Sequence, residues 1–140
     1  MNWNFCRLLC SFMLVLLLAA CSSHVQPPAE LGEMSRNDFM TAMRWKNFKA
    51  AASHLQPEHR QAFMKTFTSL KDIDITDVRL ADLQIYDEGQ RFETTVVMEY
   101  YLLPSVTVKT FSFDQTWLFF AGADPAHQGF FIATPFPDFP

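Results

Sequence analysis

The strongest limit on the fold comes from residues 91–103, where large side chains recur at every second position. A period of two is typical of a β-strand that buries one of its faces. The face that suits a core best is formed by Phe92, Thr94, Val96, Met98 and Tyr100. The sequence therefore predicts a long strand here, with a hydrophobic core on one side.

Further strand patterns lie on both sides of this segment. Residues 73–85 alternate with one slip in phase, which predicts a strand with a β-bulge. Asp87-Glu88-Gly89 predicts a tight turn into the next strand. Residues 106–120 and 128–134 are rich in strand-forming side chains. We therefore expect an antiparallel sheet of about four strands.

Upstream of residue 73 the spacing of apolar residues is helical. Ser35-Arg36-Asn37-Asp38 resembles a capping box and predicts a helix from Ser35 to about Ser53, with Arg36 outside its apolar stripe. Pro57 suits the first position of a second helix that ends near Leu70. The predicted fold class is α+β, with two amphipathic helices packed on one face of a curved antiparallel sheet.

The N-terminus indicates export. A short apolar run, Leu8 to Ala20, follows Arg7 and stops at polar residues, which is the plan of a signal peptide. The run is shorter than the stretch of about 20 apolar residues that a membrane-spanning helix needs. We therefore expect residues 1–20 to be removed.

The predicted cleavage site resembles the lipobox of bacterial lipoproteins in the residues Leu18-Ala19-Ala20-Cys21. The resemblance implies that diacylglycerol is attached to Cys21, that the chain is cut before it, and that the freed amine is acylated. Two or three acyl chains anchor a protein durably. The open alternative is an ordinary thiol after conventional signal cleavage.

The next residues give the expected location and domain division. Ser22 occupies the position where Asp would imply retention in the inner membrane, so the resemblance implies the periplasmic face of the outer membrane. Residues 21–34 are polar and contain Pro27-Pro28, which predicts a lipidated flexible tether. Residues 35–140 are then the folded domain.

Charge and motifs exclude several classes of function. The formal net charge is −4 without a cluster of Lys and Arg, which argues against nucleic-acid binding. The four glycines are isolated, so no loop is suited to cradling a phosphate. No Gly-x-Ser-x-Gly turn or metal-ligand spacing occurs either. We expect no cofactor, no metal and no set of catalytic residues.

Several segments together resemble the NTF2-like (cystatin-like) superfamily over about residues 35–133. They are an early helix with Trp45 and Phe48, Arg60-Gln61-Ala62-Phe63, Asp72-Ile73-Asp74-Ile75, and long strands with Trp117. The resemblance implies a cone between helices and sheet. Some members are isomerases or dehydratases that use an acid or a His-Asp pair within it. The chain departs from the family because it lacks a clear third helix before the sheet.

An enzyme of this type would need a pocket acid. The candidates for acid-base chemistry are Asp114, Tyr100, Tyr101, His54 and His59. Asp114 has opposite parity to Phe111 and Phe113, so it is expected to face solvent if those rings are in the core. The two histidines flank Pro57 at a spacing that does not place both on one helix face.

Aromatic residues offer two further interpretations. Trp45, Phe48, Phe63, Tyr100 and Trp117 either line an apolar pocket for a small ligand or form a plain core. Adjacent strand residues face opposite sides, so one residue of each pair Phe119-Phe120 and Phe130-Phe131 is available to a protein partner.

The function expected from the sequence is a membrane-anchored, non-catalytic binding or interaction module. The alternatives are an NTF2-like enzyme of the isomerase or dehydratase type with a pocket acid, and an assembly subunit of an envelope complex.

Overall fold

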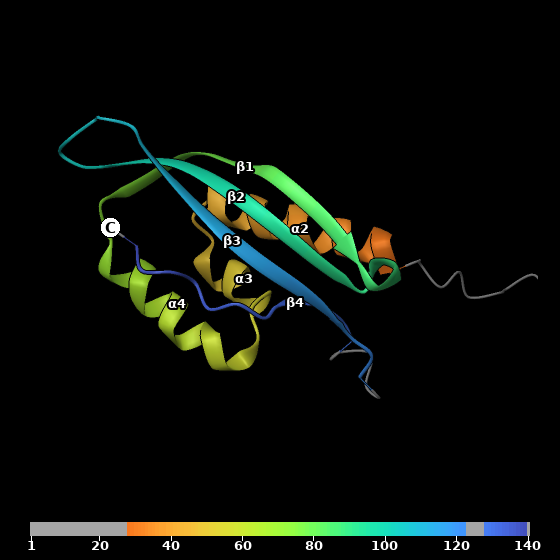
Figure 1. Ribbon diagram of the computed structural model, residues 1–140. Helices are drawn as coiled ribbons and strands as arrows, with labels where there is room; N and C mark the ends of the chain where they lie inside the picture. The colour runs from red at the N-terminus through yellow and green to blue at the C-terminus, as the bar shows by residue number, and fades with distance from the viewer. Residues whose placement is uncertain (1–27, 123–127, 140) are drawn as a thin grey trace, which may run out of the picture.

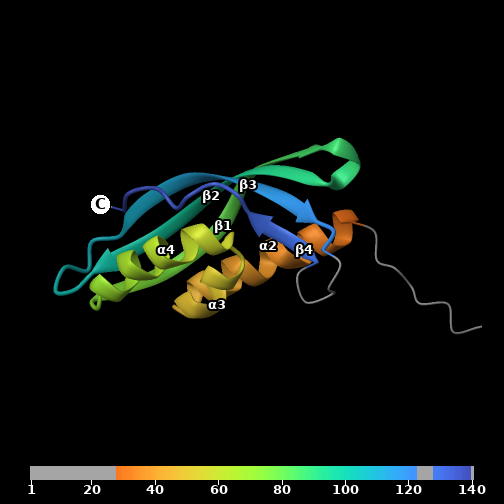
Figure 2. The same cartoon turned by 90° about the horizontal axis from the view of Figure 1, so that it is seen from below.

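The computed structural model describes residues 28–122 and 128–139, in which helices cover one face of an antiparallel sheet (Figures 1 and 2). The strands are β1 (Ile73–Tyr86), β2 (Arg91–Leu102), β3 (Lys109–Phe120) and β4 (Gly129–Ile132), and they lie in chain order across the sheet. The predicted α+β class and the four antiparallel strands are confirmed.

Strand β2 has the burial that its alternation predicts. Phe92, Thr94, Val96, Met98 and Tyr100 are all buried on the face that the helices cover. The slip in phase of β1 is also present, as register shifts against β2 between Ile75 and Asp77 and between Leu80 and Asp82. The turn that joins β1 to β2 is the short 3-10 helix η1 (Asp87–Gly89), in which Gly89 has a φ of 87°.

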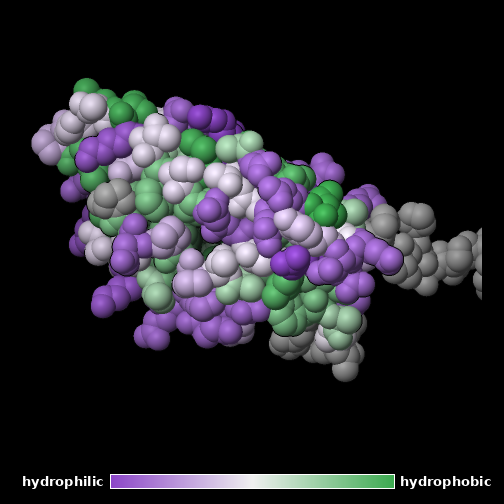
Figure 3. All heavy atoms as spheres, viewed as in Figure 1, coloured by the Kyte–Doolittle hydropathy of each residue, from purple (hydrophilic) through white to green (hydrophobic). Residues whose placement is uncertain are grey.

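Strands β3 and β4 are shorter than predicted. We expected pairing from Val106, but β3 begins at Lys109, and Val106 is 76% exposed in the β2–β3 loop. Pro104 has no amide hydrogen to donate to a ladder, and the chain leaves the sheet there. Figure 3 shows hydrophobic side chains at this end of the molecule. Strand β4 ends at Ile132, three residues before Pro135.

The described part of the chain contains three α-helices where two were predicted after residue 34: α2 (Pro28–Arg44), α3 (Phe48–Ser53) and α4 (Pro57–Ser69). The expected first helix is interrupted at Lys46, whose φ of 55° lies in the left-handed region and cannot continue a helix. Asn47 then starts α3, because its side-chain oxygen accepts a hydrogen bond from the amide of Ala50 at 3.2 Å.

The prediction that the first helix begins at Ser35 is wrong. Helix α2 begins at Pro28, so residues 28–34, assigned to the tether from the sequence, are helical. Proline is tolerated at the first helical position. Residues 1–27, with the predicted signal peptide, Cys21 and the rest of the tether, lie outside the described residues. None of the described helices is long and apolar enough to cross a membrane.

Helix α4 has the predicted bounds to within one residue and buries Phe63 and Phe67, whereas Ala62, also predicted to be buried, is exposed. The aromatic core between helices and sheet joins these rings to Phe39 of α2, Trp117 of β3 and Phe130 of β4, among others.

Helix α2 is attached to the sheet at both of its ends. At its C-terminal end, Arg44 pairs with Asp77 at 2.6 Å, and Lys46, just beyond the helix, pairs with Asp74 at 2.7 Å. At its N-terminal end, Ala29 lies against Gly89 in η1. The stretch of α2 between these attachments faces the second half of β1.

Candidate functional site

The five residues predicted to line an apolar pocket have different environments. Trp45 is 77% exposed at the break between α2 and α3, so it takes no part in a pocket or core. Phe48 is half-buried and stacks on Phe67 with ring centroids 4.3 Å apart. Phe63, Tyr100 and Trp117 are buried in the continuous core.

The C-terminal segment runs between α4 and the sheet (Figure 2). The ring of Phe136 lies 5.2 Å from that of Phe63 on α4 and 5.0 Å from that of Phe113 on β3. Phe139 lies 4.7 Å from Tyr100. The space beside Phe136, Leu55 and Phe39 has no room for a water molecule. Around Phe136 the aromatic residues form part of the hydrophobic core, as in the second of the two interpretations drawn from the sequence.

The two candidate histidines have separate structural environments. His54 is half-buried with its ring against Phe39 and Trp117, at centroid distances of 6.4 and 6.2 Å. Burial lowers the pKa of His54, Arg60 lowers it further, and Asp38 opposes both. His59 contacts the carbonyl of Ala133 through Nε2 at 3.0 Å.

The remaining candidates for acid-base chemistry are also held by structural contacts. Tyr101 donates a hydrogen bond to Asp74 at 2.9 Å, and this bond raises the pKa of Tyr101. The bond from Lys46, together with that from Tyr101, lowers the pKa of Asp74. Burial raises the pKa of Tyr100. No cluster of three or more metal-ligating side chains occurs among the described residues.

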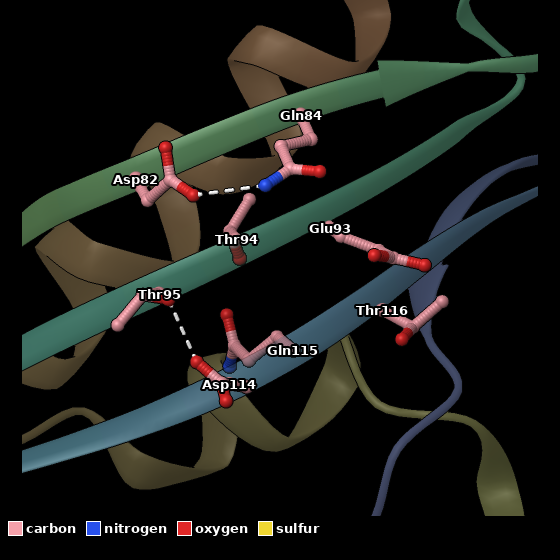
Figure 4. Close-up of a pocket in the computed structure, with 8 residues that line it drawn as sticks. All are labelled: Asp82, Gln84, Glu93, Thr94, Thr95, Asp114, Gln115 and Thr116. Atoms are coloured by element: carbon pink, nitrogen blue, oxygen red, sulfur yellow. Dashed lines mark hydrogen bonds between the residues drawn. The ribbon is translucent and has the colours of Figure 1, made fainter.

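Asp114 faces outward, as its parity predicts. It lines an open depression of about 230 Å³ on the sheet face opposite the helices, where it accepts a hydrogen bond from Thr95 at 2.7 Å (Figure 4). Asp82 and Glu93 line the same depression. The site is acidic and solvated, which does not provide the burial or charge partner that a general base needs.

The adjacent aromatic residues of β3 and β4 have the arrangement that strand parity predicts. Phe119 and Phe130 pack together at 5.2 Å, and Phe120 and Phe131 meet at 5.8 Å. Phe130 is buried, whereas Phe120 is 39% exposed. Phe120 and Phe131 border a groove of about 340 Å³ beside the start of α4.

A larger cleft, of about 580 Å³, lies between α2 and β1 and was not predicted. Its floor is apolar and consists of Leu80, Leu83 and Ile85 of β1 together with Phe92 of β2. Leu80 and Leu83 are only half-buried and Ile85 is 57% exposed, although their register partners Val96, Thr94 and Phe92 are buried. This end of β1 therefore has an apolar surface on the helix side that α2 leaves open.

The other wall of the cleft is one stripe of α2, formed by Ala29, Glu30, Glu33, Arg36 and Asn37. These positions recur at intervals that place them on one side of a helix. Arg36 is 7% exposed, and its Cζ lies 4.5 Å from the centroid of the Phe92 ring. Burial lowers the pKa of Arg36, with Glu33 opposing the effect.

Nη1 of Arg36 is buried without a hydrogen-bond partner, and no ion pair joins Arg36 to another described residue. Sequence reasoning missed this site because it began the helix at Ser35 and placed Arg36 on the polar side. The available signal was the spacing of Gly32, Arg36, Phe39 and Met43, which share one side of a helix once it starts at Pro28.

No protein-family model matches the chain, and no curated protein matches it in sequence. A SEC-C motif-containing protein of Rhodopseudomonas palustris is similar in structure, with a TM-score of 0.49 and 11% identity over 67% of this chain and 68% of that one. A candidate polyketide cyclase of Xanthomonas campestris has a TM-score of 0.48 and 14% identity over 79% of this chain and 93% of that one.

A candidate polyketide cyclase of Pseudomonas putida has a TM-score of 0.42 and 17% identity over 78% of this chain and 88% of that one. All three TM-scores are below 0.5, and no activity is transferred from these likenesses.

Proposed function

We propose that the protein is a lipid-anchored envelope protein whose domain binds a small, mainly apolar ligand in the cleft between α2 and β1, without catalysing a reaction. The observation that carries this proposal is the cleft itself. Its volume of about 580 Å³ is within the usual range for ligand sites, and its floor is formed by Leu80, Leu83, Ile85 and Phe92. Burying this floor under an apolar ligand is favourable because it removes apolar surface from water.

The anchoring part of the proposal is supported by Cys21 and its preceding residues. Only residues 22–27 lie between Cys21 and the start of α2 at Pro28. A chain of this length reaches about 20 Å when fully extended. The N-terminal half of α2, which lines the cleft, would therefore stay close to the membrane surface on the periplasmic side of the outer membrane.

The ligand site is tested with a photoreactive, uncharged analogue of dodecanol added to membranes that hold the full-length protein. We expect mass spectrometry to find the label on peptides from α2 or β1, and we expect Leu83→Arg to lose this labelling because it places a charge on the cleft floor. Val106→Arg makes a similar change in the exposed β2–β3 loop and should leave the labelling unchanged. Labelling spread over the whole chain, or unaffected by Leu83→Arg, would overturn the ligand site.

The anchor is tested separately by metabolic labelling with palmitate. We expect Cys21→Ser to abolish incorporation of the label, because the thiol is the attachment point that the lipobox resemblance implies. Cys10→Ser is the matched control and should label as the wild type does. Undiminished labelling of the Cys21→Ser protein would overturn the anchoring.

A further inference from the structure

Arg36 is a buried cation whose charge the described residues do not neutralise by direct contact. The residue is 7% exposed, and its Nη1 has no hydrogen-bond partner in the part of the chain that the structure describes. The ring of Phe92 offers its π face to the guanidinium but contributes no acceptor atom for an N–H group. Buried charges in proteins are normally paired and hydrogen-bonded, because an unpaired one costs free energy.

This unpaired group lies at the apolar cleft. Arg36 lines the cleft together with Leu80, Leu83 and Phe92, so a cation and an apolar floor share one site. A guanidinium binds carboxylate or phosphate oxygens through charge-assisted hydrogen bonds. The floor, in contrast, is suited to a hydrocarbon chain. The two features together fit a molecule that has an anionic group at one end and an apolar chain beyond it.

We propose that the ligand of this cleft is a single-chain amphiphile with an anionic head group, such as a long-chain carboxylate, whose head binds Arg36 and whose chain lies on Leu80, Leu83 and Ile85. This inference rests on the proposed function, because it specifies the ligand of the same cleft. An anchor at Cys21 would place the cleft near a membrane, where such amphiphiles are found.

The other charges of the cleft restrict where the head group binds. Glu30 and Glu33 lie on the same stripe of α2, toward its N-terminus from Arg36. They repel an anion from that part of the wall, so the head group is expected beside Arg36. The same two carboxylates disfavour a ligand with a second negative charge.

The test compares two photoreactive probes on membranes with the full-length protein: the analogue of dodecanol and the matching analogue of laurate. We expect the laurate analogue to label the cleft peptides about tenfold more efficiently at equal concentration, as a charge-assisted hydrogen bond would allow. In Arg36→Met this preference should disappear while labelling by the dodecanol analogue remains. Arg36→Lys, which keeps the charge, should retain part of the preference.

Glu33→Gln is the matched variant on the same stripe. It should increase the ratio of labelling by the laurate analogue to labelling by the dodecanol analogue, because it removes a repelling charge from the cleft wall. Circular dichroism of the purified variants checks that each one is folded.

The outcomes separate the two proposals. If neither probe labels the cleft, both the proposed function and this inference fail. If both probes label the wild-type cleft equally, or if Arg36→Met and Arg36→Lys keep the full wild-type preference for laurate, the cleft binds an apolar ligand but Arg36 does not select an anionic head group, and only this inference fails.

Discussion

The guanidinium of Arg36 lies over the ring of Phe92, with Cζ 4.5 Å from the ring centroid, and the contact is made inside the domain. Phe92 is fully buried and Arg36 nearly so. A cation–π contact is favourable by about 0.5–2 kcal/mol, which is less than the several kcal/mol that desolvating an ion costs. The contact positions Arg36, but burying its charge still lowers the free energy of unfolding. An anionic ligand would offset this loss.

This cost leads to a prediction for Arg36→Met in the absence of ligand. We expect the free energy of unfolding to rise by about 1 kcal/mol, because an apolar side chain of similar length replaces an unpaired buried charge. Urea unfolding followed by tryptophan fluorescence measures the change. Arg79→Met is the control: Arg79 is exposed and pairs with Glu99, so its loss should change stability by less than about 1 kcal/mol. Marked destabilisation by Arg36→Met would contradict the prediction.

A second prediction concerns Gly32, which faces the same ring. A Cβ built on Gly32 would lie 2.2 Å from Cε2 of Phe92. The ring has little freedom to move, because Arg36 lies over it and the Phe130 ring is 4.9 Å away. We expect Gly32→Ala to lower the free energy of unfolding by about 1–3 kcal/mol through overpacking, in spite of the higher helix propensity of alanine.

Thr41→Ala is the matched control, since Thr41 is exposed on the same helix. Its effect on urea unfolding should stay within about 0.5 kcal/mol. A Gly32→Ala protein that is as stable as the wild type would show that Phe92 can shift without cost.

The sheet could be predicted from the sequence because the apolar residues of its central strand are the residues that are buried. Residues 91–102 have a helix layer on one face only, so the apolar period of two coincides with the buried face. The slip in β1 was predictable for the same reason, because a bulge changes which parity faces the core. Both features depend on how apolar and polar residues alternate along one strand. They can be predicted without knowing which strand pairs with it.

The start of α2 and the cleft could not be predicted, because both depend on contacts between distant segments. Gly32 and Pro28 are residue types typical of a tether. They are part of a helix here because this end of α2 packs against Phe92 and η1. Arg36 is a charged residue next to a cap-like motif, and its burial depends on a ring that lies far away in the sequence. Tertiary contacts override local propensity at these positions.

The third prediction is a pH dependence of stability caused by His54. Burial lowers the pKa of His54 in the folded protein, whereas a histidine in the unfolded chain has a pKa of about 6.5. At a pH between these two pKa values, His54 binds a proton in the unfolded chain but not in the folded protein. The free energy of unfolding therefore decreases as the pH falls below about 6.5, and His54 does not change it at higher pH. Asp38 and Arg60 are the charged groups that act on the ring.

Urea unfolding at about pH 7.5 and about pH 5.5 measures the effect. We expect His54→Asn to lose less stability between these two values than the wild type does. Equal losses in the two proteins would assign the pH dependence to other groups.

The fourth prediction concerns the C-terminal segment, whose Phe136 packs between α4 and β3 against Phe63 and Phe113. Because the ring is half-buried, we expect Phe136→Ala to lower the free energy of unfolding by about 2 kcal/mol, less than a fully buried ring would. Phe120→Ala is the control, because Phe120 is 39% exposed and its ring meets that of Phe131 outside the hydrophobic core. Its cost should stay below about 1 kcal/mol. Urea unfolding that gives equal losses for the two variants would show that the C-terminal segment adds little to the stability of the core.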